Sequence, residues 1–160
     1  MRSIPLERRG DYIIKMYELD EDVCRQMLAR STFGRVAFGV GDEGLSILPV
    51  NYLYSDGAVL FRTQPGSALD RLGEGRAVAF ETDHADPVAE SGWSILVRGM
   101  ATHLRDPERI AAVADSAVRP WAPGRRDRWV EIHVEQITGR IIRRHRLVSD
   151  GQREPVMPPD

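Results

Sequence analysis

The chain has 160 residues, of which 42% are hydrophobic and 29% are charged, so its composition excludes a disordered protein and predicts one globular domain. Its 22 lysines and arginines against 24 acidic residues give a formal net charge of −2, which argues against a general nucleic-acid binder. The charged start and the absence of a long apolar run predict neither a secretory signal nor a membrane span, and the single cysteine, Cys24, favours the cytoplasm.

The first part of the chain is expected to pass from an irregular arm into one helix and three strands. Residues 1–18 show no clear period. Asp20 is placed to cap a helix with acidic residues in its first turn, and this helix should end near Ser31. Alternating apolar side chains predict strands over residues 35–40, 45–54 and 58–63, joined by short turns into an antiparallel meander.

The remaining helices are predicted from helix-capping residues, and the remaining strands from alternating apolar side chains. Ser67 and Asp70 have the spacing of a capping box, which predicts a short helix ending at Gly73 or Gly75. The triplet at residues 106–108 predicts a helix to about residue 118, followed by a loop over 119–127. Alternation predicts strands over residues 76–83, from 92 to about 104, 129–136 and 140–146, with a polar loop at 84–91.

These elements predict an α+β fold that is mainly β. Six or seven mostly antiparallel strands with short flanking helices would leave too many exposed edges in a small open sheet, so closure into a barrel is expected. No linker divides the chain, and residues 1–148 are predicted to form a single domain. Residues 149–160 include three prolines and little apolar content, and they are predicted to be a disordered tail.

Residues 61–69 carry the clearest signal for a binding site. Arg62 and Thr63 end a strand, and Ser67 caps the helix that follows a tight turn. Backbone N–H groups at a helix start favour an anion, Arg62 adds a planar fork suited to phosphate, and the two hydroxyls add donors. On these residues alone, an exposed strand arginine followed by an ordinary capped helix is the alternative.

Other candidate residues lie later in the chain. Trp93 begins a long apolar strand and suits either an aromatic cofactor or a buried interface, and Gly99 in that strand predicts a bulge or a close backbone approach. Glu81 and Asp83 could be site carboxylates or salt-bridge partners of nearby arginines. The four histidines are too scattered, and one cysteine too few, for a metal site. No metal and no catalytic acid or base is therefore predicted.

In this order, the segments GRVAF, LPVNY, LFRTQPGSAL, VAFETD, GWSILVRG and ITGR resemble the pyridoxamine 5′-phosphate oxidase-like superfamily. More narrowly, they resemble its actinobacterial flavin-nucleotide-binding branch, which is related to the nitroimidazole-resistance proteins. The resemblance covers roughly residues 17–144 and implies a split β-barrel that forms a homodimer with two FMN sites at the interface.

The resemblance also implies roles for particular residues. The FMN phosphate would be held by Arg62, Thr63 and Ser67. The flavin ring would lie against the backbone of Pro49, Val50 and Asn51, and the second subunit would contribute the region of Trp93, Ser94 and Arg140.

The function implied by the resemblance is that of a flavin-dependent oxidoreductase acting on an unidentified small molecule. One departure concerns Ala68, where relatives often carry a basic residue that contacts the phosphate, and losing one such bond costs about 1.5–3 kcal/mol. The alternatives are a non-catalytic flavin-binding or sensing protein, a relative that binds deazaflavin, FAD or haem, and a dimer without ligand. True pyridoxamine-phosphate oxidase activity is not expected, because no second phosphate site is found for that substrate.

Overall fold

The computed structural model describes residues 3–114 and 126–147 and contains one sheet in which every strand pairing is antiparallel. The helices are α1 (Glu21–Arg30), α2 (Ala68–Leu72) and α3 (Pro107–Ala114). The strands are β1 (Ser3–Arg9), β2 (Tyr12–Leu19), β3 (Phe33–Gly39), β4 (Leu45–Ser55), β5 (Ala58–Thr63), β6 (Glu74–Asp86), β7 (Ser91–His103) and β8 (Arg128–Arg146).

Six of these strands close into a barrel. The order β8-β5-β4-β3-β6-β7 returns to its start because β7 also pairs with β8. The pairing of β3 with β6 extends over only three residue pairs, so the barrel is open along most of this seam. The structure therefore confirms the predicted α+β class and split barrel, with eight strands in the described residues instead of six or seven.

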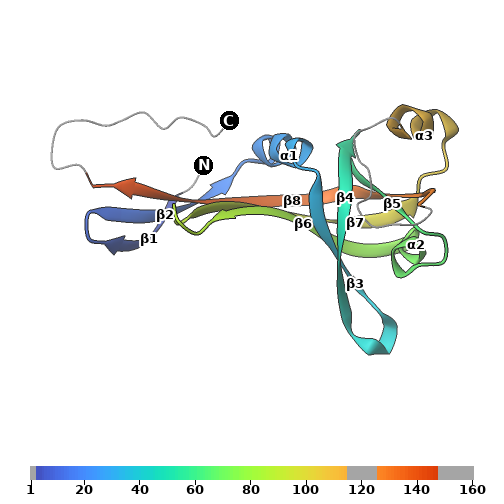
Figure 1. Cartoon of the computed structure of the whole chain (residues 1–160), viewed down its shortest axis with the longest axis horizontal. Coiled ribbons are helices and arrows are strands. Elements are labelled where there is room, and N and C mark those ends of the chain that lie inside the picture. Colours follow the sequence, from blue (N-terminus) through green and yellow to red (C-terminus); the bar gives the residue numbers. More distant parts are fainter. Residues whose placement is uncertain (1–2, 115–125, 148–160) are drawn as a thin grey trace.

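The first eighteen residues are where the prediction of an irregular arm is wrong. β1 and β2 form a hairpin whose turn is Gly10 and Asp11, with Gly10 at a φ of +57°. β2 pairs with the second half of β8, beyond the barrel, so its side chains are mostly half-buried and do not alternate. Figure 1 shows this hairpin at one end of the long sheet, with α2 and α3 at the other.

Two other boundaries also differ from the prediction. The polar loop predicted at residues 84–91 is shorter in the structure, because β6 continues to Asp86 and β7 begins at Ser91, which leaves a turn over 87–90. The two strands predicted at 129–136 and 140–146 form the single strand β8, which continues through Gly139 without ending. Here an added Cβ would lie 2.6 Å from Cys24 Sγ, so the glycine serves close packing and no turn forms.

The helices follow the sequence signals where the structure describes them. α1 ends at Arg30, as expected, and buries Cys24 and Leu28 against the sheet. α3 begins at Pro107, but the predicted continuation to residue 118 and most of the 119–127 loop lie outside the described residues. The predicted tail, residues 149–160, lies outside them as well.

The hydrophobic core lies inside the barrel. Its largest fully buried side chains include Tyr52, Phe61 and Phe80, which come from β4, β5 and β6. A smaller cluster lies on the outer face of β5, where Leu60 and Trp129 pack with Val113 of α3. The two faces of β5 are therefore both covered, and its end leads directly into α2.

The hairpin of β3 and β4 projects away from the rest of the molecule in Figure 1. Along β4, the side chains of Leu45 and Ile47 are 86% and 64% exposed, although both are large and apolar. The two residues are two apart on one strand, so their side chains lie on the same face and form one apolar patch. This hairpin therefore presents an apolar surface that no other described part of the chain covers.

Gly99 lies at a bulge in the pairing of β7 with β8, as its position in the sequence predicted. The register shifts between Arg98 and Gly99, and a Cβ added at Gly99 would lie 1.7 Å from the carbonyl oxygen of His133. The close approach of the two backbones is therefore possible only with glycine.

Candidate functional site

The turn between β5 and α2 brings together two of the three side chains predicted to bind phosphate. The hydroxyl oxygens of Thr63 and Ser67 lie 2.8 Å apart. The Asp70 N–H donates to Ser67 Oγ at 3.1 Å, and the Gly66 N–H donates to Asp70 Oδ2 at 2.8 Å. The predicted cap forms, with the carboxylate reaching one residue further back than in the usual capping box. These two backbone donors are therefore already in use.

Asp70 is the centre of the polar contacts at this turn. Its Oδ1 lies 3.0 Å from His103 Nε2 and 3.3 Å from Arg128 Nε. Burial raises the pKa of the Asp70 carboxyl, but hydrogen bonds from Gly66 and His103 and the charge of Arg128 outweigh this effect, and the pKa lies below its ordinary value. Asp70 is thus ionised at neutral pH. Its carboxylate links the turn, through the Gly66 N–H, to His103 of β7 and Arg128 of β8.

Arg62 lies on the opposite face of β5 from Thr63, because successive residues of a strand alternate. Its guanidinium carbon lies 5.4 Å from the centre of the Trp129 ring, which is a cation–π contact. Within the described part of the chain, Arg62 Nε is buried and has no hydrogen-bond partner. A buried donor of this kind is costly to leave unpaired, so the atom suits an acceptor that the described residues do not supply.

Pro49, Val50 and Asn51 lie on β4 near the same end of the barrel. β4 pairs with β5 up to Tyr52, so Asn51 is next to the end of β5 that carries Arg62. Val50 is buried, Asn51 is half-buried and Pro49 is exposed. The segment is therefore near the phosphate turn, while its contact with a flavin ring stays a prediction.

Trp93, Ser94 and Arg140 lie far from this turn. Ser94 pairs with Arg140 across β7 and β8, and Trp93 is half-buried beside it. Along β7, ten residues separate Trp93 from His103, the residue that contacts Asp70. Ten residues of strand span about 33 Å. A single chain therefore does not bring the two predicted groups of site residues together.

Two hollows, of about 570 and 630 Å³, open around Trp93 at this far end. Ser94 and Arg140 line the larger hollow with Met16 of β2. Arg143 and His145 line the smaller one. From the sequence, Arg143 is only one of several arginines in the last third of the chain, and His145 only one of four scattered histidines. Both belong to the part of β8 that pairs with β2. This pairing could not be predicted, because the side chains of β2 do not alternate between buried and exposed.

The acidic pair on β6 is engaged in salt bridges. Arg35 Nη1 donates to Glu81 at 3.0 Å and to Asp83 at 2.6 Å. Burial and the charge of Asp83 raise the pKa of Glu81, although Arg35 opposes this change. Of the two interpretations of these carboxylates, the structure therefore confirms salt bridging.

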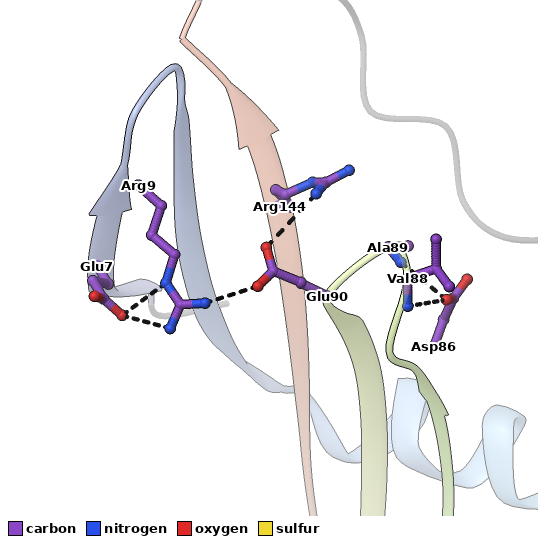
Figure 2. A network of polar contacts seen from close by, with 7 residues as sticks. All are labelled: Glu7, Arg9, Asp86, Val88, Ala89, Glu90 and Arg144. Carbon is purple, nitrogen blue, oxygen red and sulfur yellow. Dashed lines mark hydrogen bonds and ion pairs between the residues drawn. The ribbon is translucent and has the colours of Figure 1, made fainter.

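A network of charged side chains joins the β1–β2 hairpin to the turn between β6 and β7, as Figure 2 shows. Arg9 donates to Glu7 at 3.0 Å and to Glu90 at 2.8 Å, and Arg144 lies 3.6 Å from Glu90. In the turn itself, the Asp86 carboxylate accepts from the N–H groups of residues 88 and 89. Each exposed ion pair contributes little to stability by itself, and a network of several such pairs contributes more. Asp86 and Glu90 of this network line the hollows around Trp93.

His145 predicts a pH dependence of stability. Burial and the positive charges of Lys15 and Arg143 lower the pKa of His145, whose Nε2 lies 3.0 Å from the Tyr17 hydroxyl. Because the folded state binds this proton less readily than the unfolded chain, the contribution is complete above about pH 6.5 and is lost as the pH falls below that value. We expect His145→Gln to reduce the loss of unfolding free energy between pH 7 and pH 5, measured by urea denaturation.

The matched control is His84→Gln, because the His84 side chain is exposed and forms no hydrogen bond with the described residues. This variant should keep the pH dependence of the wild type. Equal slopes for His145→Gln and the wild type would contradict the assignment.

In the described residues, no group of three or more His, Cys, Asp and Glu side chains gathers closely enough to hold a metal ion. Among the same residues, no helix combines the length and the apolar content needed to cross a membrane.

Comparison with known proteins places the chain in a family. The family model described as pyridoxamine 5′-phosphate oxidase matches residues 20–141. An uncharacterized protein of Mycobacterium tuberculosis (strain ATCC 25618 / H37Rv) is 36% identical over 143 residues, which cover 86% of this chain and 90% of that protein.

Solved structures agree with this match. The FAD binding protein from Mycobacterium smegmatis is 33% identical, with a TM-score of 0.68 over 79% of this chain and 98% of that one. An FAD and haem binding protein from the same species is 11% identical, with a TM-score of 0.61 over 89% of each chain, and shows the shared fold alone. The chain therefore belongs to the pyridoxamine 5′-phosphate oxidase family.

Proposed function

We propose that this chain binds a flavin nucleotide, FMN in the first place, through the turn between β5 and α2. The observation that carries the proposal is the buried Nε of Arg62, which lacks an acceptor in the described residues and lies at the end of β5, on the face opposite the Thr63 and Ser67 hydroxyls. A guanidinium and two hydroxyls are donors that suit phosphate. The backbone of residues 49–51 would then lie against the flavin ring.

The relatives support a flavin more strongly than any other group. The Mycobacterium smegmatis protein that is 33% identical is an FAD binding protein, and FAD contains the flavin and the first phosphate of FMN. FAD, haem and a deazaflavin are the alternatives for this chain. When bound, a flavin supplies hydride or electron transfer, and the chain's own residues bind and orient it. We propose an oxidoreductase on this basis.

We further propose that two copies of the chain build each site. About 33 Å of strand separates Trp93 from the phosphate turn within one chain, whereas a two-fold dimer can place them side by side. The exposed apolar side chains of Leu45, Ile47 and Ile142 support this proposal, because a second copy would cover them. Binding and dimer formation should therefore be lost together on dilution.

The test of the cofactor is an absorbance spectrum of the purified protein from 300 to 550 nm, followed by mass spectrometry of the ligand released by heat. Flavin bands with the mass of FMN are expected. A colourless protein that takes up neither added FMN nor added FAD would overturn the proposal.

Arg62→Ala is expected to weaken FMN binding at least about tenfold, because a charge-assisted contact with the phosphate disappears. Fluorescence titration of the apoprotein measures this change. Arg30→Ala is the control, because Arg30 is exposed at the end of α1 and has no hydrogen bond or ion pair with the described residues. An unchanged dissociation constant for Arg62→Ala would remove Arg62 from the site.

A non-catalytic flavin-binding or sensing protein is the second candidate function. It is favoured by the salt bridges of Arg35 with Glu81 and Asp83, which engage both carboxylates that the sequence offered as site groups. Bound flavin that no nicotinamide reductant reduces would support this function. Steady turnover with such a reductant would exclude it.

A further inference from the structure

Arg128 lies on the same face as the phosphate turn, although it is distant in sequence. It is the first residue of β8 and pairs directly with Thr63, the last residue of β5. Residues directly opposite each other on antiparallel strands point to the same face. Arg62 is paired with Trp129 and therefore points to the other face. Of these two arginines, Arg128 is on the side of the Thr63 hydroxyl.

The contact with Asp70 fixes where the Arg128 guanidinium lies. Arg128 Nε is 3.3 Å from Asp70 Oδ1, and Asp70 in turn holds the turn through the Gly66 N–H. The two terminal nitrogens of Arg128 form no hydrogen bond with residues that the structure describes, and the side chain is 49% exposed. None of the described residues therefore occupies the fork of this guanidinium, which can donate to a ligand.

The negative charge of Asp70 favours a cation on this side of the turn. Asp70 is ionised, and its charge lies within hydrogen-bond distance of the segment that carries Ser67. The backbone N–H groups of Gly66 and Asp70 are already bonded, and α2 has only five residues, so the helix itself adds little attraction. Arg128 therefore offsets part of the Asp70 charge that a phosphate at this turn would meet.

We propose that Arg128 is a phosphate-binding residue of this site and supplies the positive charge that Ala68 cannot. Asp70 positions Arg128, and the terminal nitrogens of Arg128 donate to the phosphate from the side of Thr63 and Ser67. Arg62 donates from the other side of the strand end. The inference rests on the proposed function, because it assumes a ligand with a phosphate at this turn.

The experiment compares FMN with riboflavin, which has the same ring and no phosphate. Dissociation constants are measured by fluorescence titration for the wild type, Arg128→Gln, Arg128→Lys and the control Arg30→Gln. We expect Arg128→Gln to weaken FMN binding about 10- to 100-fold and to leave riboflavin binding unchanged. Arg128→Lys should fall between, because it keeps the charge and loses the planar fork. Arg30→Gln should match the wild type.

The outcomes separate this inference from the proposed function. FMN binding by Arg128→Gln within twofold of the wild type would overturn the role of Arg128 and leave the flavin site in place. Equal losses for FMN and riboflavin would also overturn it, because a phosphate contact cannot affect riboflavin. A wild type that binds neither FMN nor FAD would overturn the proposed function, and the role of Arg128 with it. Thermal unfolding of each variant confirms that the fold is intact.

Discussion

Replacing Gly99 by alanine is expected to lower the free energy of unfolding by about 3 kcal/mol or more. The added Cβ would lie 1.7 Å from the His133 carbonyl oxygen and 2.9 Å from its carbonyl carbon. Both atoms belong to the backbone, so no side-chain rotation can relieve the clash. The two strands would have to separate at the bulge, where β7 and β8 close the barrel. Urea denaturation at a fixed protein concentration measures the change.

Gly39→Ala is the matched control. Gly39 is also a strand glycine, but it is exposed and an added Cβ would meet nothing within 4 Å. Alanine there should change the stability by no more than about 1 kcal/mol, and its effect on the unfolded chain is favourable. Equal unfolding midpoints for the two variants would show that the backbones at Gly99 can separate at little cost.

The barrel strands could be predicted because their side chains alternate between the core and the outside. Val36 and Phe38 on β3, and Val78 and Phe80 on β6, are buried in this manner. The extension of the sheet beyond the barrel could not be read in the same way. β2 is half-buried at nearly every position, and the last residues of β6 are exposed on both faces, so neither has a period-two pattern.

Glycine within a strand led to one wrong prediction and one correct one. Gly139 follows Thr138 and resembles a turn, yet its role is to let Cys24 of α1 and Ile95 approach β8. Gly99 gave the correct signal because the surrounding strand is long and apolar. The difference depends on contacts between elements that are far apart in sequence, and these contacts cannot be read from a glycine alone.

The candidate site shows the same division between local and distant contacts. Ser67 and Asp70 are three residues apart, so their cap could be predicted from spacing. The contact of Arg128 with Asp70 depends on the register of β5 against β8, which the sequence does not specify. Successive side chains of a strand point to opposite faces, so Arg62 and Thr63 lie on opposite faces of β5. The prediction that both hold one phosphate did not take this into account.

A mixture of two defective variants is expected to recover FMN binding that neither variant shows alone. Arg62 belongs to the phosphate end of the sheet and Arg140 to the Trp93 end, and about 33 Å of strand separates these ends in one chain. If each site takes one end from each subunit, Arg62→Ala and Arg140→Ala both damage every site in their own homodimers. A mixed dimer then has one intact site and one site with both defects.

Random pairing of equal amounts makes about half of the dimers mixed, so about a quarter of all sites should bind FMN with wild-type affinity. Co-expression with two affinity tags and sequential purification isolates the mixed dimers, in which half of the sites should be restored. The control mixes Arg62→Ala with the wild type in equal amounts. About half of all sites should then bind FMN tightly, because about a quarter of the dimers are wild-type homodimers with two intact sites and each mixed dimer keeps one. Mixed Arg62→Ala and Arg140→Ala dimers that bind no more FMN than the parent variants would place both arginines in the same subunit's site, or Arg140 outside it. Recovery of tight binding can arise only from a site that two chains share, because neither chain in the mixed dimer carries both arginines.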